Sequence, residues 1–332
     1  MSYKKILNTA IKVILPLFLG CGLLWYLYRG ADLSQMWAHA KKASLGILLF
    51  SLLFGLAGNL VRSFRWGLLI DAIGEKYRIR NLICAVLGNY AINFVLPRVG
   101  EVWRCGIITR YEKISFTKLL GTLVIDRVAD TLSVGIITLL IFFFNLSFVE
   151  TYLSRNPSFK ISLDNQSSTI WIIVALLIIA AATWFTFTRL SHLSLVQKAR
   201  GGLVNIWEGM KSVWLMERKW LFLLQTLGIW SLYFLFFYTT FYAFDFTRNL
   251  GPVKGLIVFT MSSIGVAAPV QGGIGAWHFM VISSLVCFDV PAEEAAAFAL
   301  VVYTIQSVWQ IVCGLVGIVA LPMMNKEEKL QE

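Results

Sequence analysis

The residues best suited to chemistry in this sequence are three charged side chains inside an apolar segment. Asp126, Arg127 and Asp130 lie within residues 119–144, which are otherwise rich in Leu, Ile, Val and Phe. Each charge placed at the middle of a bilayer costs roughly 2.5–3.5 kcal/mol on the insertion scale, so the three cannot face lipid. Asp126 and Asp130 share one helix face because they are four residues apart. We therefore expect all three charges to be paired inside the protein.

Arginines lie in two other segments, and one of these segments is expected to supply the partners of the carboxylates. Arg98 and Arg104 are the nearest in sequence, because they lie just before the charged span. Arg62 and Arg65 lie three residues apart, near the end of the apolar segment that begins at residue 45. A planar guanidinium offers a fork of donors, so this second pair could contact a headgroup phosphate. It could equally be an anchor for its helix at the cytoplasmic surface.

Two apolar segments are broken by proline and glycine at the same spacing. The first break has Pro97 followed by Gly100, and the second has Pro269 followed by Gly272. Proline removes a backbone donor and glycine permits dihedrals that other residues avoid, so two helix ends can meet at each break. Non-helical backbone at membrane depth is tolerated only where protein or a water-filled cavity surrounds it. Breaks at corresponding places in the two halves of a chain indicate a transport site.

We expect the two breaks to enclose a central cavity. Arg98, Glu101 and Arg104 would form its floor, and the second break would form its roof. Arginines could hold a lipid phosphate there by charge-assisted hydrogen bonds, and glycines could present backbone amides to an anion. The candidate substrate-binding residues are Arg62, Arg65, Asn93, Arg98, Glu101, Arg104, Asp126, Arg127, Asp130, Gln271, Gly272, Gly273, Trp277 and His278.

Alternatives stay open for several of these residues. The pairs Arg98–Glu101 and Arg127–Asp130 could be purely structural ion pairs that lock a broken segment to the charged span. His278 could be a buried residue with satisfied hydrogen bonds. It could also sense protons, because the ordinary pKa of imidazole, roughly 6.5, lies near working pH.

The composition is that of a polytopic membrane protein. Of the 332 residues 58% are hydrophobic, against roughly 45–50% in soluble domains, and they come in long runs. The net charge of +11 indicates basic cytoplasmic loops and, secondarily, attraction to anionic lipid headgroups. Nucleic-acid binding is not expected, because the charges are divided among short loops. The five cysteines have neither metal-ligand nor redox spacing.

A bundle of membrane-spanning helices must position the charged residues. We expect an all-α fold with about six full spans and two re-entrant helical hairpins. A polar loop at residues 145–168 and an amphipathic surface helix at residues 203–214 would join them. The expected spans are residues 11–28, 45–60 (extended toward 70), 119–144, 169–187, 220–244 and 292–321, and the hairpins are residues 81–112 and 252–289.

The order of spans and hairpins predicts an inverted repeat within a single transmembrane domain, residues 1–332. The first repeat would be residues 44–145 with the inner hairpin, and the second residues 219–322 with the outer hairpin. By this topology about 21 Lys and Arg lie inside and about 7 outside. We therefore expect both termini to be cytoplasmic, in a bacterial-type inner membrane.

Catalytic motifs are missing from the sequence. It has no nucleophile elbow with a Ser-His-Asp order, no His-Glu-x-x-His and no metal-spaced Cys/His set. It has no phosphate-binding loop of the Gly-x-x-x-x-Gly-Lys-Ser/Thr type. We expect no enzymatic activity and no cofactor, and transport that is downhill or coupled to an ion.

In these motifs the chain resembles the flippase-like family that includes the membrane part of lysyl-phosphatidylglycerol synthases. The motifs that carry the resemblance are Asn93 to Glu101 with Arg104, Asp126-Arg127 with Asp130, Pro269 with Gly272 to Gly275, and Arg62, Arg65 and Trp66. The resemblance covers nearly the whole chain. It implies movement of a lipid or lipid-linked headgroup across the inner membrane, with membrane lipids that are anionic or phosphate-bearing as partners.

The chain departs from the family pattern in two ways. The family usually has a glutamate where this sequence has His278, so the charge of the outer hairpin differs. No aminoacyl-transferase domain follows Glu332, so we do not expect synthesis of the aminoacylated lipid. Two other functions stay open: a membrane enzyme or accessory protein of lipid-linked glycan metabolism, and a small-anion secondary transporter on the same inverted-repeat plan.

Overall fold

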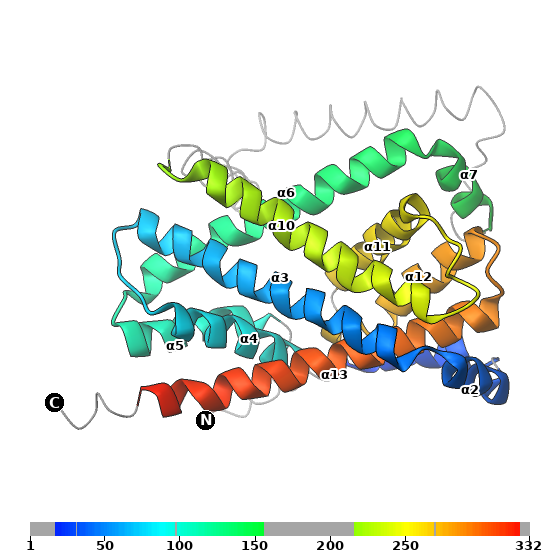
Figure 1. Ribbon diagram of the computed structural model, residues 1–332, viewed down its shortest axis with the longest axis horizontal. Helices are drawn as coiled ribbons and strands as arrows, with labels where there is room; N and C mark the ends of the chain where they lie inside the picture. Colours follow the sequence, from blue (N-terminus) through cyan, green and yellow to red (C-terminus); the bar gives the residue numbers. More distant parts are fainter. Residues whose placement is uncertain (1–16, 31, 97, 156–215, 269, 326–332) are drawn as a thin grey trace, which may run out of the picture. The chain divides into compact units, whose positions relative to one another are not determined.

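The computed structural model of the protein describes residues 17–30, 32–96, 98–155, 216–268 and 270–325. The elements of secondary structure in these ranges are helices, drawn in Figure 1. The chain divides into two compact units, one formed by Met1–Thr138 and Trp220–Glu332 and the other by Leu139–Lys219. The prediction of an all-α fold is confirmed for the described residues.

Among the described residues, four helices are long and apolar enough to cross a membrane. They are α3 (Leu45–Ala72), α6 (Phe116–Phe144), α10 (Lys219–Tyr238) with its 3₁₀ extension η2 (Thr239–Ala243), and α13 (Ala292–Met324). At 1.5 Å per residue even the shortest of these segments exceeds the roughly 30 Å of a hydrocarbon core. Each coincides with an expected span, so the chain is a polytopic membrane bundle.

The remaining two expected spans fall partly or wholly outside the described residues. A short apolar helix, Leu17–Tyr28, is the described part of the first span. The fourth span, residues 169–187, and the amphipathic helix at residues 203–214 lie outside the described ranges. Between the first span and α3 the chain forms an additional helix, α2 (Leu33–Lys42), which begins where the Asp32 carboxylate accepts the Ser34 and Gln35 amides. Such an N-cap satisfies donors that a helix end leaves free.

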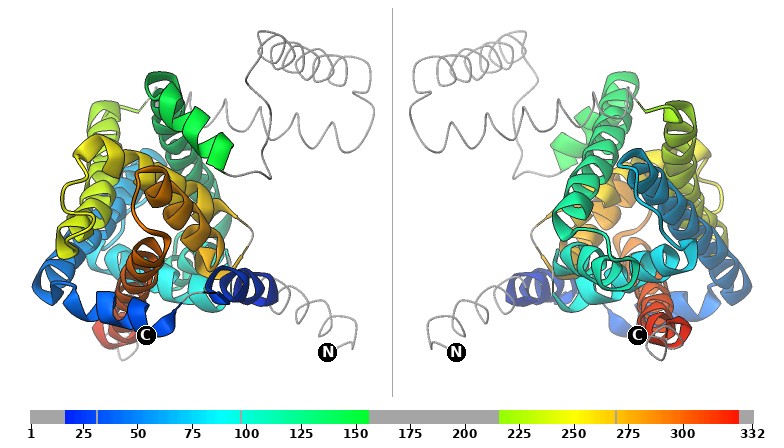
Figure 2. Two further views of the ribbon diagram at one scale, coloured as in Figure 1. Left: turned by 90° about the vertical axis from the view of Figure 1, so that its right-hand side faces the viewer. Right: turned by 90° about the vertical axis from the view of Figure 1, so that its left-hand side faces the viewer.

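Each of the two breaks predicted from the sequence lies between a pair of shorter helices. The first pair is α4 (Ile79–Val95) and α5 (Val99–Glu112). The second is α11 (Pro252–Ala267) and α12 (Ala276–Cys287), joined through a 3₁₀ turn, η3 (Gln271–Gly273). The longest of these, α4, measures about 26 Å, so none crosses a bilayer alone. Figures 1 and 2 show the two pairs toward opposite ends of the long helices.

The helix breaks lie where the sequence predicts them. Arg98, the residue before α5, has a left-handed backbone with φ of 64°, and Gly272 has φ of 58°. A left-handed residue cannot continue a right-handed helix, so each pair is interrupted at these positions. The prolines at positions 97 and 269 themselves lie outside the described residues.

Helix α13 packs against both pairs of short helices. In its second half, Gly314 and Gly317 lie against Ala91 and the carbonyl of Cys84 on α4. A Cβ at Gly314 would lie 2.5 Å from the Ala91 Cβ, so only small residues permit this approach. Its first half contributes to an aromatic core with α10, η2, α11 and α12. The core includes Phe237, Phe241, Phe244, Phe259, Trp277 and Phe298.

One predicted loop is wrong. Residues 146–155 were expected in a polar loop, and they form a helix, α7 (Leu146–Arg155). Phe148 and Tyr152 are buried, and they are four residues apart on one face. The apolar residues of this segment follow a helical period, which the polar residues between them obscured. Residues 156–168 of the same expected loop lie outside the described part of the chain.

Candidate functional site

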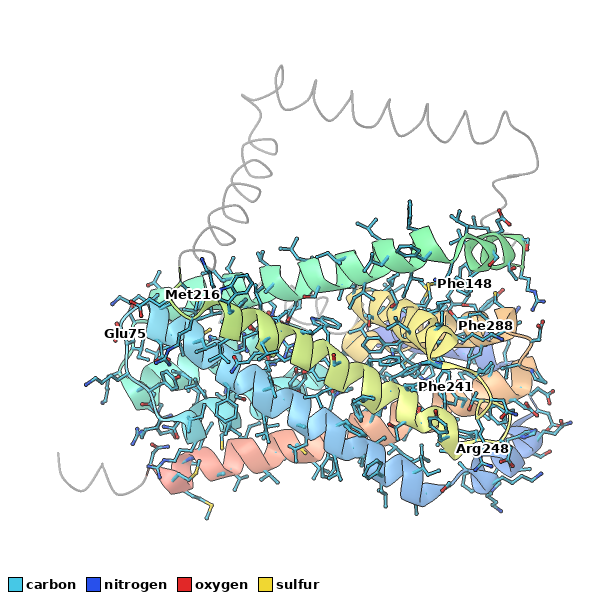
Figure 3. The ribbon with its side chains drawn as sticks, turned by 45° about the horizontal axis from the view of Figure 1, so that its top comes forward. Glu75, Phe148, Met216, Phe241, Arg248 and Phe288 are labelled. Carbon is cyan, nitrogen blue, oxygen red and sulfur yellow. The ribbon has the colours of Figure 1, made fainter. Side chains whose placement is uncertain are left out.

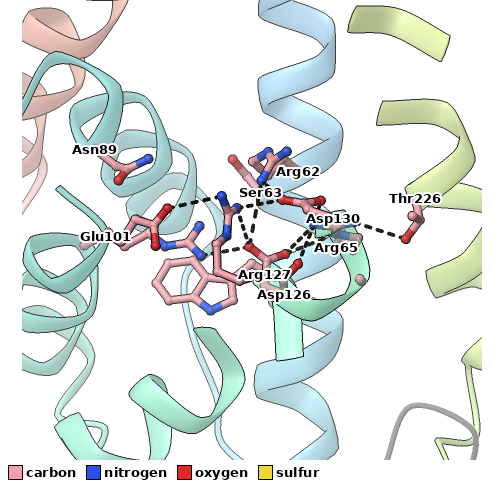
Figure 4. Close-up of polar contacts among 12 residues, drawn as sticks. Arg62, Ser63, Arg65, Asn89, Glu101, Asp126, Arg127, Asp130 and Thr226 are labelled. Carbon is pink, nitrogen blue, oxygen red and sulfur yellow. Dashed lines mark hydrogen bonds and ion pairs between the residues drawn. The ribbon is translucent and has the colours of Figure 1, made fainter. Parts of the chain in front are cut away.

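The centre of the candidate site is Asp126, on the first half of α6. Its side chain is fully buried. Oδ1 accepts a hydrogen bond from Arg65 Nη2 at 2.7 Å, and Oδ2 accepts from Arg104 Nη2 at 2.8 Å and from Arg127 Nη2 at 3.0 Å. These arginines belong to α3, α5 and α6, so one carboxylate connects three helices. Figure 4 shows Arg65 and Arg127 beside Asp126.

Asp130 lies one turn further along α6 and is held by two of these arginines, Arg65 and Arg127, and by Arg62. Arg62 Nη1 is 2.5 Å from Oδ2, and Arg65 Nη2 is 2.6 Å from Oδ1. Arg127 Nη2 is 2.9 Å from Oδ2. Arg62 and Arg65 reach the two carboxylates together because i, i+3 spacing places them on one face of α3. The predicted internal pairing of the charged span is confirmed.

The first pair of short helices, α4 and α5, contributes Arg104 to the site. Its side chain is fully buried, and its guanidinium lies 4.5 Å from the centre of the Trp66 ring. Trp66 is fixed in turn by a 3.0 Å hydrogen bond from its indole to the Thr122 hydroxyl. Stacking on an aromatic face suits a guanidinium, which is weakly hydrated and planar. The ring therefore orients Arg104 and leaves the edges of its guanidinium available for hydrogen bonds.

Glu101 completes the cluster at its more exposed side. Its Oε1 accepts a hydrogen bond from Arg127 Nη1 at 3.2 Å. The side chains of Arg127 and Glu101 are 36% and 24% exposed, whereas those of Asp126, Arg65 and Arg104 are fully buried. The cluster therefore has a buried side centred on Asp126 and a more accessible side at the Arg127–Glu101 pair.

The arginine cluster, as we call these seven residues, carries one positive charge in excess. Its members are Arg62, Arg65, Glu101, Arg104, Asp126, Arg127 and Asp130. Within the described chain, Arg104 Nε, Arg104 Nη1 and Arg127 Nε are buried and have no hydrogen-bond partner. A buried charge without compensation is costly, and so is a buried donor without an acceptor. An anion with several oxygen atoms would satisfy both deficits.

Hydroxyl groups from α10 and α4 extend the cluster. Arg62 Nε donates to the Tyr233 hydroxyl at 3.1 Å, which donates to Asn59 Oδ1 at 2.8 Å. The Tyr90 hydroxyl lies 2.9 Å from that of Tyr233, and Arg65 Nη1 donates to Thr226 at 3.2 Å. Thr226 and Tyr233 were not predicted from the sequence as site residues. Their signal was present, because the two polar groups are seven residues apart on one face of an apolar span.

The second break contacts the first through a side chain. Gln271 Nε2 donates to the carbonyl of Val95, the last residue of α4, at 2.8 Å. The Tyr303 hydroxyl of α13 donates to the Gly272 carbonyl at 2.8 Å. Gln271 thus satisfies one of the carbonyl groups that the end of α4 leaves without a partner. The end of α4 therefore meets the turn between α11 and α12, which is far from it in sequence.

Comparison with known proteins identifies the family. Residues 13–314 match the family described as the lysylphosphatidylglycerol synthase TM region. The chain belongs to this family. It is similar to the UPF0104 membrane protein MJ1595 of Methanocaldococcus jannaschii, with 20% identity over 291 residues that cover 79% of this chain and 81% of the relative. The resemblance predicted from the motifs is confirmed, and the chain is a multi-pass membrane protein.

In this member of the lysylphosphatidylglycerol synthase TM region family, the predicted site residues fall into three groups. The seven of the arginine cluster come together in one ion network. Asn93 lies at the first break, where its Oδ1 accepts the Gly100 amide at 2.9 Å. The last group lies at the second break and consists of Gln271, Gly272, Gly273, Trp277 and His278.

Arg98 lies outside all three groups. Its side chain is exposed, and it forms no ion pair with the described residues. The predicted Arg98–Glu101 pair is replaced by Arg127–Glu101, and Arg62 and Arg65 take the place that Arg98 was expected to have beside Asp130. Arg98 has a left-handed backbone and precedes the first residue of α5, whereas Arg104 lies within that helix.

Proposed function

We propose that the protein is a flippase or scramblase-like transporter that moves a phospholipid or a lipid-linked phosphate across the membrane. The arginine cluster would bind the phosphate of the headgroup while the acyl or polyprenyl chains stay in the bilayer. In this proposal membrane lipids are the partners, no cofactor takes part and the chain makes or breaks no covalent bond.

The observation that carries the proposal is the excess positive charge of the arginine cluster. Three buried guanidinium nitrogen atoms, on Arg104 and Arg127, have no acceptor among the described residues. A phosphate offers several oxygen acceptors and at least one negative charge, and arginine binds it in a planar, charge-assisted geometry. Ionisable groups inside membrane spans usually mark substrate pathways. A phosphate-bearing headgroup fits each of these properties.

The arrangement of the short helices supports a transport role. Helices α4, α5, α11 and α12 are each too short to cross a bilayer, and the end of α4 meets the turn between α11 and α12 at the Gln271–Val95 contact. We propose that each pair is a re-entrant hairpin and that the two hairpins belong to repeats of inverted topology, residues 44–145 and 219–322. In such transporters the substrate site lies near the midplane, between the repeats. The distribution of basic residues supports the proposal that both termini lie in the cytoplasm, in a bacterial-type inner membrane.

The test is lipid transport by purified protein in liposomes. We expect the wild type to move fluorescent phosphatidic acid or a short polyprenyl phosphate between leaflets. Arg104→Ala should slow this transport about tenfold or more, the effect of one lost hydrogen bond to a charged group. Arg104→Lys should not restore it fully, because lysine lacks the planar fork. Arg110→Ala is the matched control, because Arg110 is exposed on the same helix.

Transport that is equally fast in the wild type and in Arg104→Ala would refute the proposal, provided that both unfold at the same temperature. Flux of inorganic phosphate without any movement of lipid would favour a small-anion transporter instead. Release of phosphate or sugar from a lipid-linked substrate would favour an enzyme of lipid-linked glycan metabolism.

A further inference from the structure

We infer a second anion-binding site, separate from the arginine cluster, at the N-terminus of α12. Its donors are the first backbone amides of that helix together with the imidazole of His278. The ligand chemistry is an anionic oxygen group such as a phosphate. Binding at this site does not depend on whether the protein moves lipid.

The first turn of α12 has free amide donors. The residue before the helix, Gly275, offers no side chain to cap it, and the first turn has no acidic residue. Across the described chain, the amides of Ala276, Trp277 and His278 make no hydrogen bond. The first amides of any helix carry partial positive charge and need acceptors. At this end an acceptor is therefore missing.

The corresponding end of the first short-helix pair is satisfied from within the protein. There the Gly100 amide of α5 donates to Asn93 Oδ1 at 2.9 Å, and the first turn carries Glu101. Both features are the usual complements of a helix N-terminus. Helix α12 has neither, although Trp277 and His278 of its first turn are buried.

His278 supplies the second, independent indication of a ligand. Its side chain is 1% exposed, and Nδ1 has no hydrogen-bond partner in the described chain. His278 is the third residue of α12, and helical side chains lean toward the N-terminus of their helix. Its ring centre lies 4.6 Å from that of Tyr303, whose hydroxyl donates to Gly272. The imidazole therefore lies beside the turn that precedes the helix, where Nδ1–H can donate to an anion.

The surroundings favour an anion that is partly stripped of water. The rings of Trp277 and Tyr28 pack against His278, with centres at 5.4 and 6.1 Å. The carbonyl of Gly20 lies 2.8 Å from where a Cβ on Gly275 would be, so the first span covers one side of the turn. Ile274, within the turn, remains partly exposed. Hydrogen bonds in such a low-dielectric setting are stronger than in water.

The donors define the ligand class. Backbone amides at a helix N-terminus together with one imidazole N–H suit a single oxyanion group, as at other helix N-termini that bind phosphate. Broken helices of membrane transporters also direct such ends at anionic substrate groups. A lipid headgroup and free phosphate share this chemistry, so the experiment must separate them.

The experiment follows the imidazole nitrogen signals of His278 by NMR, in purified protein that contains isotope-labelled histidine. The chain has three histidines, and His278→Phe assigns the signal. We expect it to shift saturably on addition of sodium phosphate or of dihexanoyl phosphatidic acid. Dihexanoylglycerol, which lacks the phosphate, should have no effect. A response to phosphatidic acid alone would identify a lipid headgroup as the ligand, and a response to both would identify a general phosphate site.

Variants distinguish phosphate binding beside His278 from lipid transport by the arginine cluster. His278→Phe should weaken phosphate binding about tenfold, the effect of one lost hydrogen bond to a charged group. His278→Gln, which keeps a donor, should weaken it less, and His39→Phe on α2 is the control for loss of a histidine. Arg104→Ala should leave the His278 response intact, even if it stops lipid transport. If neither phosphate probe shifts the His278 signal of the wild type, the second site does not exist.

Discussion

Asp126 accepts hydrogen bonds from three arginines, and each of these arginines also contacts a second side chain. Arg65 bridges to Asp130, Arg104 stacks on an indole and Arg127 bridges to Glu101. Charges buried in this manner are tolerated because almost every one faces an opposite charge at hydrogen-bond distance. The same reasoning makes single substitutions costly, since each leaves a partner unpaired.

Arg65→Met tests this dependence. Arg65 is fully buried and holds both Asp126 and Asp130, at 2.7 and 2.6 Å. Its loss leaves two buried carboxylates short of a partner, so we expect destabilisation of about 3–5 kcal/mol. Unfolding of the protein in detergent micelles, followed by circular dichroism, measures the change.

The matched control is Lys118→Met. Lys118 pairs with Glu75 at 2.6 Å, but its side chain is 55% exposed. Exposed ion pairs contribute about 0–1 kcal/mol, so this variant should unfold almost as the wild type does. Equal stability of the two variants would contradict the account of the buried cluster.

At the scale of elements, α4 and α5 approach each other closely at Gly100. The Gly100 amide donates to Asn93 of α4, and a Cβ on Gly100 would lie only 2.2 Å from the Asn89 carbonyl. Arg104 follows one helical turn later on α5 and depends on this approach for its place beside Asp126. The packing of a glycine therefore sets the position of a charged group.

Gly100→Ala should separate the two helices. The added methyl group meets the backbone of α4, which cannot move aside as a side chain can, so we expect a loss of about 1–3 kcal/mol. Gly106→Ala, on the same helix, meets nothing within 4 Å and should be neutral or stabilise by up to about 1 kcal/mol. Thermal unfolding in detergent compares the two, and equal midpoints would show that the α4–α5 contact does not hold the pair.

For the whole molecule, the distribution of basic residues predicts which ends of the helices face the cytoplasm, and this orientation can be measured. Glu75 and Arg248 lie toward opposite ends of the bundle in Figure 3. We expect Lys76→Cys, next to Glu75, to react with a membrane-impermeant maleimide only from the cytoplasmic side. Arg248→Cys should react only from outside, since positive charge is retained inside. Both substitutions are made in a variant in which the five native cysteines have been replaced. Labelling of both from the same side would overturn the topology.

The sequence by itself determined the features that depend on local composition and on the bilayer. Four spans, two interrupted segments and the internal pairing of the charges on α6 followed from hydrophobic length and from the cost of a charge in lipid. The helix at residues 146–155 did not follow, because its short apolar face was read as part of a polar loop. The extension of the cluster by Tyr233 and Thr226 was also missed, although its spacing was visible.

Only the tertiary structure decided which charges meet. Arg98 was as good a partner in sequence as Arg104, yet Arg104 reaches Asp126 and Arg98 is exposed. Arg62 and Arg65, which could have been surface anchors, lie at the centre of the cluster instead. The physical reason is that ion pairing between helices depends on how their faces pack. A single left-handed residue or a glycine against a carbonyl sets that packing, and neither is encoded in the spacing of the charges.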